Sequence, residues 1–387
     1  MYLFLRNDIL TNIQKASFSV GFPAAYLMSL FLCSYFLKLP RFDFFNRILA
    51  INIIVYSFLG LCLSTLRLPL FSREVFLTEF LLTSLFLVVY YMLCHRLFPK
   101  HIGVMPKVDF ESFSNYHFLS FSHIRDFSID QPSLDGVVAH LRGEIDSDVS
   151  YYLTTLAQQN VPVYDDNVLI ETLQGRIPLS NITTAEIDSF NPPEIYSTIK
   201  RVVEIALIVI MSPLLLVVSA AISIAIKIDS HGQVFFRQPR TGLAGTPFTI
   251  IKFRTMTDKS GLENRFTEKE DKRITRVGRV LRRLRFDELP QLWNVLKGDM
   301  SIIGPRPEQL EFTDRFDRSI PFYGFRHTIR PGITGWAQVM YGYADSEEQT
   351  RYKLEYDFFY IKHMSLWLDI VVLAKTIRTI FWGVGAR

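Results

Sequence analysis

Three long apolar runs occupy most of the first hundred residues. Residues 16–37, 48–66 and 75–94 hold at most one charged side chain each, and each is close to the ~20 residues that a membrane-spanning helix needs. Buried core helices are the alternative interpretation, but three such runs separated by short charged loops favour spanning helices. The pattern therefore predicts three transmembrane helices within residues 1–107.

Basic side chains beside these runs predict the orientation of the helices. Membrane proteins carry an excess of Lys and Arg in cytoplasmic loops. The loop after the first run and the segment after the third are both basic, which places both in the cytoplasm and the N-terminus outside. Arg67 and Arg73 in the second loop weaken this interpretation. The cations on which it depends are Lys38, Arg41, Arg47, Arg96, Lys100 and Lys107.

Residues 108–195 have a different pattern. Short β-rich runs such as HFLSFS, DGVVAHL and VPVYD alternate with the helix-like SDVSYYLTTLAQQN, which predicts a small cytoplasmic α/β domain. No G-x-G-x-x-G follows a strand, so the pattern gives no reason to expect a bound dinucleotide. A polar, proline-broken stretch from Asn181 to Thr198 predicts a linker.

The segment after the linker is the most unusual apolar run. Residues 202–226 carry a single charge, Glu204, and are interrupted near the middle by Ser212 and Pro213. Proline removes one helical hydrogen bond, and the Ser212 hydroxyl can reach a carbonyl that this leaves free. Two shapes stay open: a kinked helix that spans the bilayer, or a re-entrant helix whose ends emerge on the same side.

Two amphipathic segments follow in the last third of the chain. In TRVGRVLRRLRF, Val277, Val280, Leu281 and Leu284 recur at helical spacing, while arginines crowd the remaining positions. A solvated helix and a nucleic-acid-binding helix are alternatives. The apolar segments elsewhere favour anionic membrane lipids or a lipid phosphate as the partner of Arg282 and Arg283, and no nucleic acid. The second segment, residues 366–382, has the apolar face and border tryptophans of an interfacial helix.

Composition agrees with a membrane component. Apolar residues make up 49% of the 387 residues, which is high for a purely soluble protein. The net charge of +4 is unevenly distributed, so local patches are more informative than the total. Cys33, Cys62 and Cys94 show no paired spacing, and the histidines show no metal-binding spacing, which argues against disulfides and structural zinc.

The adjacent acids Asp287 and Glu288 are the most informative polar pair. Helix neighbours at i and i+1 point about 100° apart, so the pair suits a helix start, with Pro290 in the first turn and Gly298 as the stop. Asp287 would then lie near the N-cap, where the helix favours negative charge. A simple capping acid beside a solvated neighbour is the alternative.

Cations on glycine- and proline-rich segments favour a catalytic role for these acids. Arginine and lysine are the residues that grip phosphate oxygens, and glycines 242 and 245 in TGLAG form another possible phosphate-approach loop. Mg²⁺ binds through one or two carboxylates plus phosphate oxygens, and a carboxylate can act as a nucleophile toward phosphorus. A diphosphate substrate with Mg²⁺ is therefore predicted. The cations concerned are Lys252, Arg254, Arg306 and Arg330.

The region from Tyr196 to Gly383 resembles the bacterial sugar transferase family, the monotopic polyprenyl-phosphate hexose-1-phosphate transferases. The resemblance rests on seven ordered motifs: KRVVE, SP at 212–213, GQVFFRQPRTG, IKFRTM, DELPQLWNVLKGDMS, GPRP and RPGITGWAQV. One departure is Glu204, where the family more often has Asp. The N-terminal half is similar to the larger members, which carry membrane helices, usually four, and a small Rossmann-like unit.

The resemblance implies a complete reaction. A sugar 1-phosphate would pass from a UDP-sugar to undecaprenyl phosphate with Mg²⁺, releasing UMP, as the first membrane step of polysaccharide or glycan assembly. Asp287 would be the nucleophile and metal ligand, with Glu288 as its catalytic partner. Ser212 and Pro213 would form the turn of a re-entrant helix. The residues implied as phosphate, nucleotide or structural contacts are Lys252, Arg254, Arg306, Arg330 and Asp357.

These inferences together give the expected architecture. We expect a mixed α/β protein of the bacterial inner membrane with transmembrane helices at 1–107, a small α/β domain and linker at 108–195, and a mainly α catalytic domain at 196–387. The catalytic domain, with its re-entrant helix at 202–226, would face the cytoplasm. The sequence leaves a homo-oligomer open. A polytopic phosphosugar transferase and a non-catalytic membrane scaffold are the rival interpretations.

Overall fold

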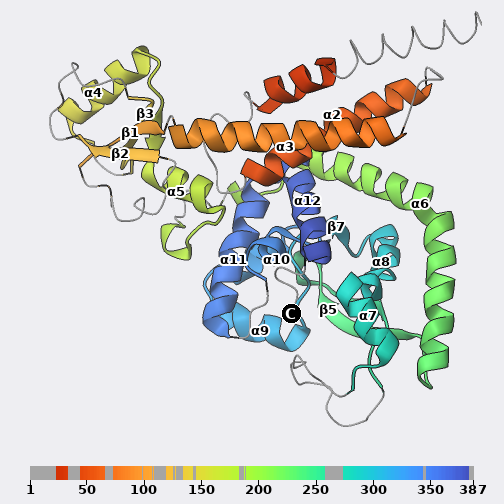
Figure 1. The fold of residues 1–387 in the computed structure, drawn as a ribbon. Coiled ribbons are helices and arrows are strands. Elements are labelled where there is room, and N and C mark those ends of the chain that lie inside the picture. The colour runs from red at the N-terminus through yellow and green to blue at the C-terminus, as the bar shows by residue number, and fades with distance from the viewer. Residues whose placement is uncertain are drawn as a thin grey trace, which may run out of the picture. The chain divides into compact units, whose positions relative to one another are not determined.

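The computed structural model shows two compact units, Met1–Gly175 and Arg176–Arg387. Together they are mixed α/β and mostly helical (Figure 1), which confirms the predicted fold class at that level. The structure describes residues 23–33, 44–65, 73–97, 99–106, 108, 119–124, 127, 134–142, 145–182, 187, 189–257, 273–342 and 346–382.

The three apolar runs of the first unit are helical wherever they are described. The helices are Pro23–Cys33, α2 (Phe44–Thr65) and α3 (Arg73–Leu97), and the remainder of the predicted 16–37 run lies outside the described residues. α2 and α3 pack together, with the Tyr56 hydroxyl 2.6 Å from the Thr83 hydroxyl. Among the described helices, two are long and apolar enough to cross a membrane: α3, over Phe76–Cys94, and α6 of the second unit.

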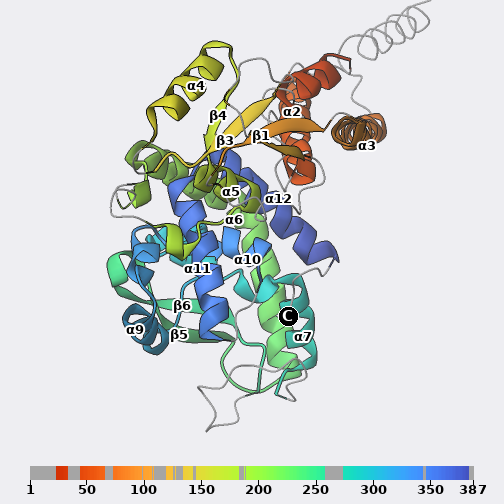
Figure 2. The same ribbon diagram turned by 90° about the vertical axis from the view of Figure 1, so that its left-hand side faces the viewer.

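A four-stranded parallel sheet completes the first unit. Its order is β2 (Leu119–His123), β1 (Lys100–Val104), β3 (Gly136–Ala139) and β4 (Val163–Asp165). Helix α4 (Ser147–Gln158) packs on one face and α5 (Asp166–Gln174) on the other (Figure 2), because neighbouring strand residues point to opposite faces. Strand β1 lies before residue 108, where the α/β domain was predicted to begin. Its sequence, KHIGV, does not alternate clearly between apolar and polar residues, so the pattern did not indicate a strand.

The predicted linker is packed against the second unit. The Arg176 guanidinium pairs with the Glu355 carboxylate at 2.6 Å, and the Phe190 ring lies 5.0 Å from that of Phe358. The segment includes a 3-10 turn, η2 (Leu179–Asn181). Arg176 precedes the predicted linker, Asn181–Thr198, whereas Phe190 belongs to it, and residues 183–186 and 188 lie outside the described residues. The linker stays a prediction.

The second unit is mainly helical around small pieces of sheet. An antiparallel hairpin joins β5 (Phe235–Thr241) to β6 (Pro247–Phe253) through the turn η4 (Leu243–Gly245), and β7 (Ser301–Ile303) pairs in parallel with β8 (Gly332–Thr334). The remaining elements are α7 (Arg276–Leu284), η5 (Phe286–Glu288), α8 (Gln291–Lys297), α9 (Leu310–Ser319), η6 (Tyr323–His327), α10 (Trp336–Met340), α11 (Glu347–Lys362) and α12 (Leu366–Trp382).

Helix α6 (Glu194–Asp229) bends sharply partway along (Figure 1). Pro213 has no N–H to donate to the Val209 carbonyl, and the Ser212 hydroxyl donates to that carbonyl instead, at 2.7 Å. Both arms bury one face against the second unit: Ile208 packs with Val295, and Ile222 packs with Leu281. The opposite face leaves Ile210 and Leu216 more than 70% exposed.

The charged residues of the KRVVE motif fix the first arm of α6. The Lys200 ammonium pairs with Asp369 of α12 at 2.8 Å and donates to the Ile303 carbonyl. The Arg201 guanidinium donates to the Val295 and Leu296 carbonyls at the end of α8. The buried Glu204 carboxylate accepts from the Ser301 hydroxyl and the Ile302 N–H. The glutamate therefore reaches strand β7 directly.

Replacing Glu204 should destabilise this arrangement. Glu204→Ala leaves a buried hydroxyl and a buried N–H without their acceptor, so we expect a loss of about 1–3 kcal/mol in the free energy of unfolding. Thermal unfolding of the purified protein, followed by tryptophan fluorescence, measures this. The matched control is Glu194→Ala, at the exposed start of the same helix. Equal changes in the two variants would contradict the anchoring role.

Candidate active site

Three cations converge on the buried carboxylate of Glu288. Its Oε1 lies 2.9 Å from the Arg306 guanidinium, 3.1 Å from the Lys252 ammonium and 3.7 Å from the Arg285 guanidinium. Only 5% of Glu288 is exposed. Lys252 comes from β6, Arg285 from the end of α7 and Arg306 from the GPRP segment. The fold therefore brings the predicted acid together with two of the predicted phosphate-binding cations.

Asp287 lies beside this cluster with an uncommitted oxygen. Its Oδ1 is buried and has no hydrogen-bond partner among the described residues. The pair sits in the turn η5, and the N-cap of α8 is Pro290. Asp287 thus lies three residues before the N-cap of α8, in a separate turn that begins where a left-handed Arg285 (φ 59°) ends α7. The predicted stop at Gly298 is confirmed.

The two acids have opposite electrostatic surroundings. Burial and the adjacent Glu288 charge raise the pKa of Asp287 above its ordinary value, against the pull of Lys252 and Arg285. Burial opposes the charge of Glu288 too, but Arg306, Lys252 and Arg285 outweigh it and lower the pKa of that carboxyl. Burial also lowers the pKa of Lys252. The site thus pairs a firmly ionised Glu288 with a more basic Asp287.

A rigid segment presents Arg306 to the acids. Pro305 and Pro307 fix φ on both sides of this residue. Just before this segment, the backbones of Gly304 and Gly332 approach closely. A Cβ added at Gly332 would lie 2.1 Å from the Gly304 nitrogen. That contact requires glycine at 332. The motifs GPRP and RPGITGW therefore meet in space, as neighbours along β7 and β8.

Arg254 and Arg330 contact helix ends. The Arg254 guanidinium donates to the Ser230 carbonyl and hydroxyl, at the C-terminus of α6. The Arg330 Nε donates to the Gly298 carbonyl, just after α8. Carbonyls at helix C-termini attract cations, so these contacts have a structural reason. A role of either residue in binding substrate stays a prediction.

Asp357 belongs to a second buried ion cluster behind the site. Its carboxylate lies 3.0 Å from the Arg326 guanidinium, and both side chains are only 2% exposed. Glu308 lies 2.7 Å from the Lys353 ammonium and 3.8 Å from Arg326. Asp357 therefore contacts Arg326, and its predicted contact with substrate stays a prediction.

The predicted basic helix is confirmed as α7. Its apolar residues Val277 and Leu281 pack against the second arm of α6 (Figures 1 and 2), while Val280 stays 57% exposed. The Arg282 Nε donates to the Thr255 hydroxyl at 2.9 Å, and Arg283 is exposed. Whether these two arginines meet a lipid phosphate stays a prediction.

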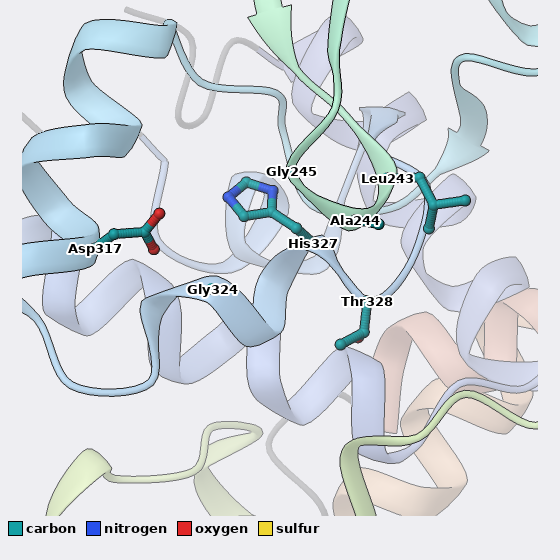
Figure 3. A pocket seen from close by; sticks show the side chains of 7 residues that line it. All are labelled: Leu243, Ala244, Gly245, Asp317, Gly324, His327 and Thr328. Atoms are coloured by element: carbon teal, nitrogen blue, oxygen red, sulfur yellow. The ribbon is translucent and has the colours of Figure 1, made fainter.

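A pocket of about 350 Å³ lies at the opposite end of the hairpin (Figure 3). Its lining includes Leu243, Gly245 and His327. Burial lowers the pKa of His327 to about 3. Lys252 lies five residues further along strand β6 than Pro247, which corresponds to roughly 17 Å. The N–H groups of Gly242 and Gly245 already donate within the turn. This does not support the phosphate-approach role predicted for TGLAG.

Sequence reasoning missed the residues that support the site. Arg285, Glu308, Arg326 and Lys353 were not predicted, although two of them left a signal. Glu308 directly follows GPRP, and Lys353 precedes Asp357 by one helical turn, on the same helix face. Arg326 has no comparable pattern around it.

Comparisons with known proteins bear on this arrangement. The profile described as Bacterial sugar transferase matches residues 195–383. A UDP-N-acetylgalactosamine-undecaprenyl-phosphate N-acetylgalactosaminephosphotransferase from Aeromonas hydrophila is 42% identical over 335 residues, which cover 86% of this chain and 79% of the relative.

Two further relatives match about half of this chain. UDP-glucose:undecaprenyl-phosphate glucose-1-phosphate transferases from Xanthomonas campestris pv. campestris and Escherichia coli K12 are 40% and 39% identical. The matches cover 52% and 46% of this chain, and 42% and 39% of the relatives. The chain thus belongs to the bacterial sugar transferase family, the enzyme class that its motifs predict.

Proposed function

We propose that this chain transfers a sugar 1-phosphate from a UDP-sugar to undecaprenyl phosphate. The observation that carries the proposal is the buried acid pair in which Glu288 is held by three cations while Asp287 keeps an uncommitted oxygen. The names of the relatives supply the substrates. Because the Aeromonas hydrophila relative is named for N-acetylgalactosamine, UDP-N-acetylgalactosamine is the first donor to test.

The proposed reaction has two displacements at one phosphorus. The Asp287 carboxylate attacks the sugar-bearing phosphorus of the UDP-sugar, and the bridging P–O bond breaks so that UMP leaves with the bridging oxygen. A phosphate oxygen of undecaprenyl phosphate then attacks the same phosphorus and releases the Asp287 carboxylate. One difficult displacement is divided into two easier ones. The raised pKa of Asp287 is consistent with a nucleophilic carboxylate.

The surrounding cations fit a diphosphate. Lys252, Arg282, Arg285 and Arg306 all lie close enough to act on the charges of the acid pair. The four cations outnumber the two carboxylates of Asp287 and Glu288, so the site carries an excess of positive charge, which favours an anionic substrate. Glu288 holds the cations in place, and they can share their hydrogen bonds with phosphate oxygens.

Asp287 also fits the expected Mg²⁺. The described residues contain no cluster of three side chains suited to a metal, but Mg²⁺ commonly binds through one or two carboxylates together with substrate phosphates. The unpaired Oδ1 of Asp287 is suited to that role. When bound, Mg²⁺ would neutralise phosphate charge that repels an attacking carboxylate.

We further propose that α6 is a re-entrant membrane helix of the bacterial inner membrane, with the catalytic unit in the cytoplasm. The bend at Pro213 and the burial of both arms against one unit support this. A straight spanning helix would carry Leu281 and Val295, the contacts of its two arms, to opposite membrane faces. Nucleotide sugars and the first step of polysaccharide or glycan assembly are cytoplasmic in this arrangement.

Covalent chemistry at Asp287 can be measured directly. Given UDP-sugar and Mg²⁺ without a lipid acceptor, the wild type should release up to one UMP per enzyme and gain the mass of a sugar phosphate. Asp287→Asn should do neither, because its amide cannot form the intermediate. Asp317→Asn, an acid at the distant pocket, serves as the control and should behave like the wild type. Turnover by Asp287→Asn would exclude this nucleophile.

The two acids should have opposite effects on stability. Asp287 has a pKa raised above 3.8, so its ionised form costs stability at pH 7, and Asp287→Asn should unfold at an equal or higher temperature. Glu288 has a pKa lowered below 4.5, so its charge stabilises the fold above that pH and ceases to do so as the pH falls through the lowered value. Glu288→Gln leaves buried cations unpaired, which costs about 3–5 kcal/mol.

Thermal unfolding at pH 7 compares the two variants. The order of their melting temperatures is the decisive result, because it does not depend on any reaction. If Asp287→Asn were destabilised as much as Glu288→Gln, the assignment of the cations to Glu288 would be wrong.

Single cysteines test the re-entrant shape. Thr198 and His231 lie on either side of the apolar segment 202–226 of α6 and are both exposed, so each can be replaced by Cys in a background without Cys33, Cys62 and Cys94. A thiol reagent that does not cross the inner membrane should label neither site in intact cells and both after permeabilisation. Labelling of only one site in intact cells would mean that α6 spans the membrane.

A further inference from the structure

The backbone around Arg306 is held at four consecutive carbonyls. The Pro305 carbonyl accepts from the Gly332 N–H, the Pro307 carbonyl from the Arg240 guanidinium, and the Glu308 carbonyl from the Thr241 N–H. The carbonyl of Arg306 itself accepts from the Arg326 guanidinium at 2.9 Å. Arg326 therefore holds the carbonyl group next to the Cα that carries the Arg306 side chain.

The two terminal nitrogens of the Arg326 guanidinium are both engaged at this position. Besides the Arg306 carbonyl, its guanidinium contacts the Tyr323 hydroxyl at 2.6 Å and the Asp357 carboxylate at 3.0 Å. The side chain is only 2% exposed. The planar fork of arginine can make these contacts at once, whereas the compact ammonium of lysine cannot.

The charge around Arg326 is balanced within its own cluster. Arg326 and Lys353 face Glu308 and Asp357, so two positive charges meet two negative ones. Burial opposes the charge of Arg326, but Tyr323, Asp357 and Glu308 outweigh it and raise the pKa of the guanidinium. Arg326 thus needs no charge from the acid pair, and its one bond toward the site is to the neutral Arg306 carbonyl.

We propose that Arg326 is a positioning residue for the transfer reaction: it holds the Arg306 carbonyl so that the Arg306 guanidinium points at Glu288. The inference rests on the proposed function for its kinetic effect and on geometry alone for its structural effect. Arg326 does not touch the reacting atoms in this scheme. It acts through Arg306, and Asp357 in turn orients Arg326.

Arg326→Lys tests the kinetic effect. Loss of a buried charge-assisted hydrogen bond should let Arg306 move from Glu288 and lower the rate of UMP release about 10- to 100-fold, with kcat changing more than KM.

A double-mutant cycle distinguishes positioning from general damage. In an Arg306→Gln background, Arg326→Lys should cause little further loss of turnover, because the residue through which it acts is already gone. Multiplying losses would overturn the proposal. Lys353→Gln is the matched control: it disturbs the same ion cluster through Glu308 but leaves the bond to the Arg306 carbonyl intact. It should lower stability without the fall in kcat expected for Arg326→Lys.

Hydrogen exchange provides a readout that needs no activity. Peptides covering residues 301–308 should exchange faster in Arg326→Lys than in the wild type or Lys353→Gln. If the wild type releases no UMP, the proposed function fails, and the exchange result still decides whether Arg326 holds the segment. Unchanged exchange in Arg326→Lys would overturn the positioning role even if the enzyme is active.

Discussion

The buried negative charge of Glu288 is the constraint on which the site depends. Lys252, Arg285 and Arg306 come from three separate segments and would repel one another if they were buried together without a counter-charge. A carboxylate at their centre makes the convergence favourable, and it fixes β6, the end of α7 and the GPRP segment relative to one another. Asp287 lies among the same cations because it directly precedes Glu288 in the chain.

The ion cluster around Arg326 and the acid pair Asp287 and Glu288 differ in their charge balance. The cluster of Arg326, Lys353, Glu308 and Asp357 is neutral. Around Asp287 and Glu288 the cations outnumber the acids. The ion pairs behind Arg306 are thus balanced, whereas the acid pair carries an excess of positive charge.

Much of this organisation could be predicted from the sequence, and the parts that could not have physical reasons. Long runs of apolar residues located α2, α3 and α6, and helical spacing of apolar residues located α7, because both report directly which positions avoid water. The kink followed from Pro213, since a missing N–H acts locally. The acid pair could be singled out, but its partners could not be ranked: Lys252 and Arg306 reach Glu288, whereas Arg254 and Arg330 reach helix ends. Pairings between distant segments depend on how the chain folds, which no local pattern records.

The four hydrogen-bonded carbonyls from Pro305 to Glu308 restrict which atoms of the site can move when a substrate binds. A segment with four carbonyls hydrogen-bonded in a row and two of its φ angles fixed by proline is poorly suited to act as a hinge. The side chain of Arg306 is held by Glu288 at 2.9 Å, and it can exchange this contact for another anion without any movement of the backbone. At this wall of the site, recognition of an arriving phosphate would then be a matter of side-chain reorientation on a stationary backbone.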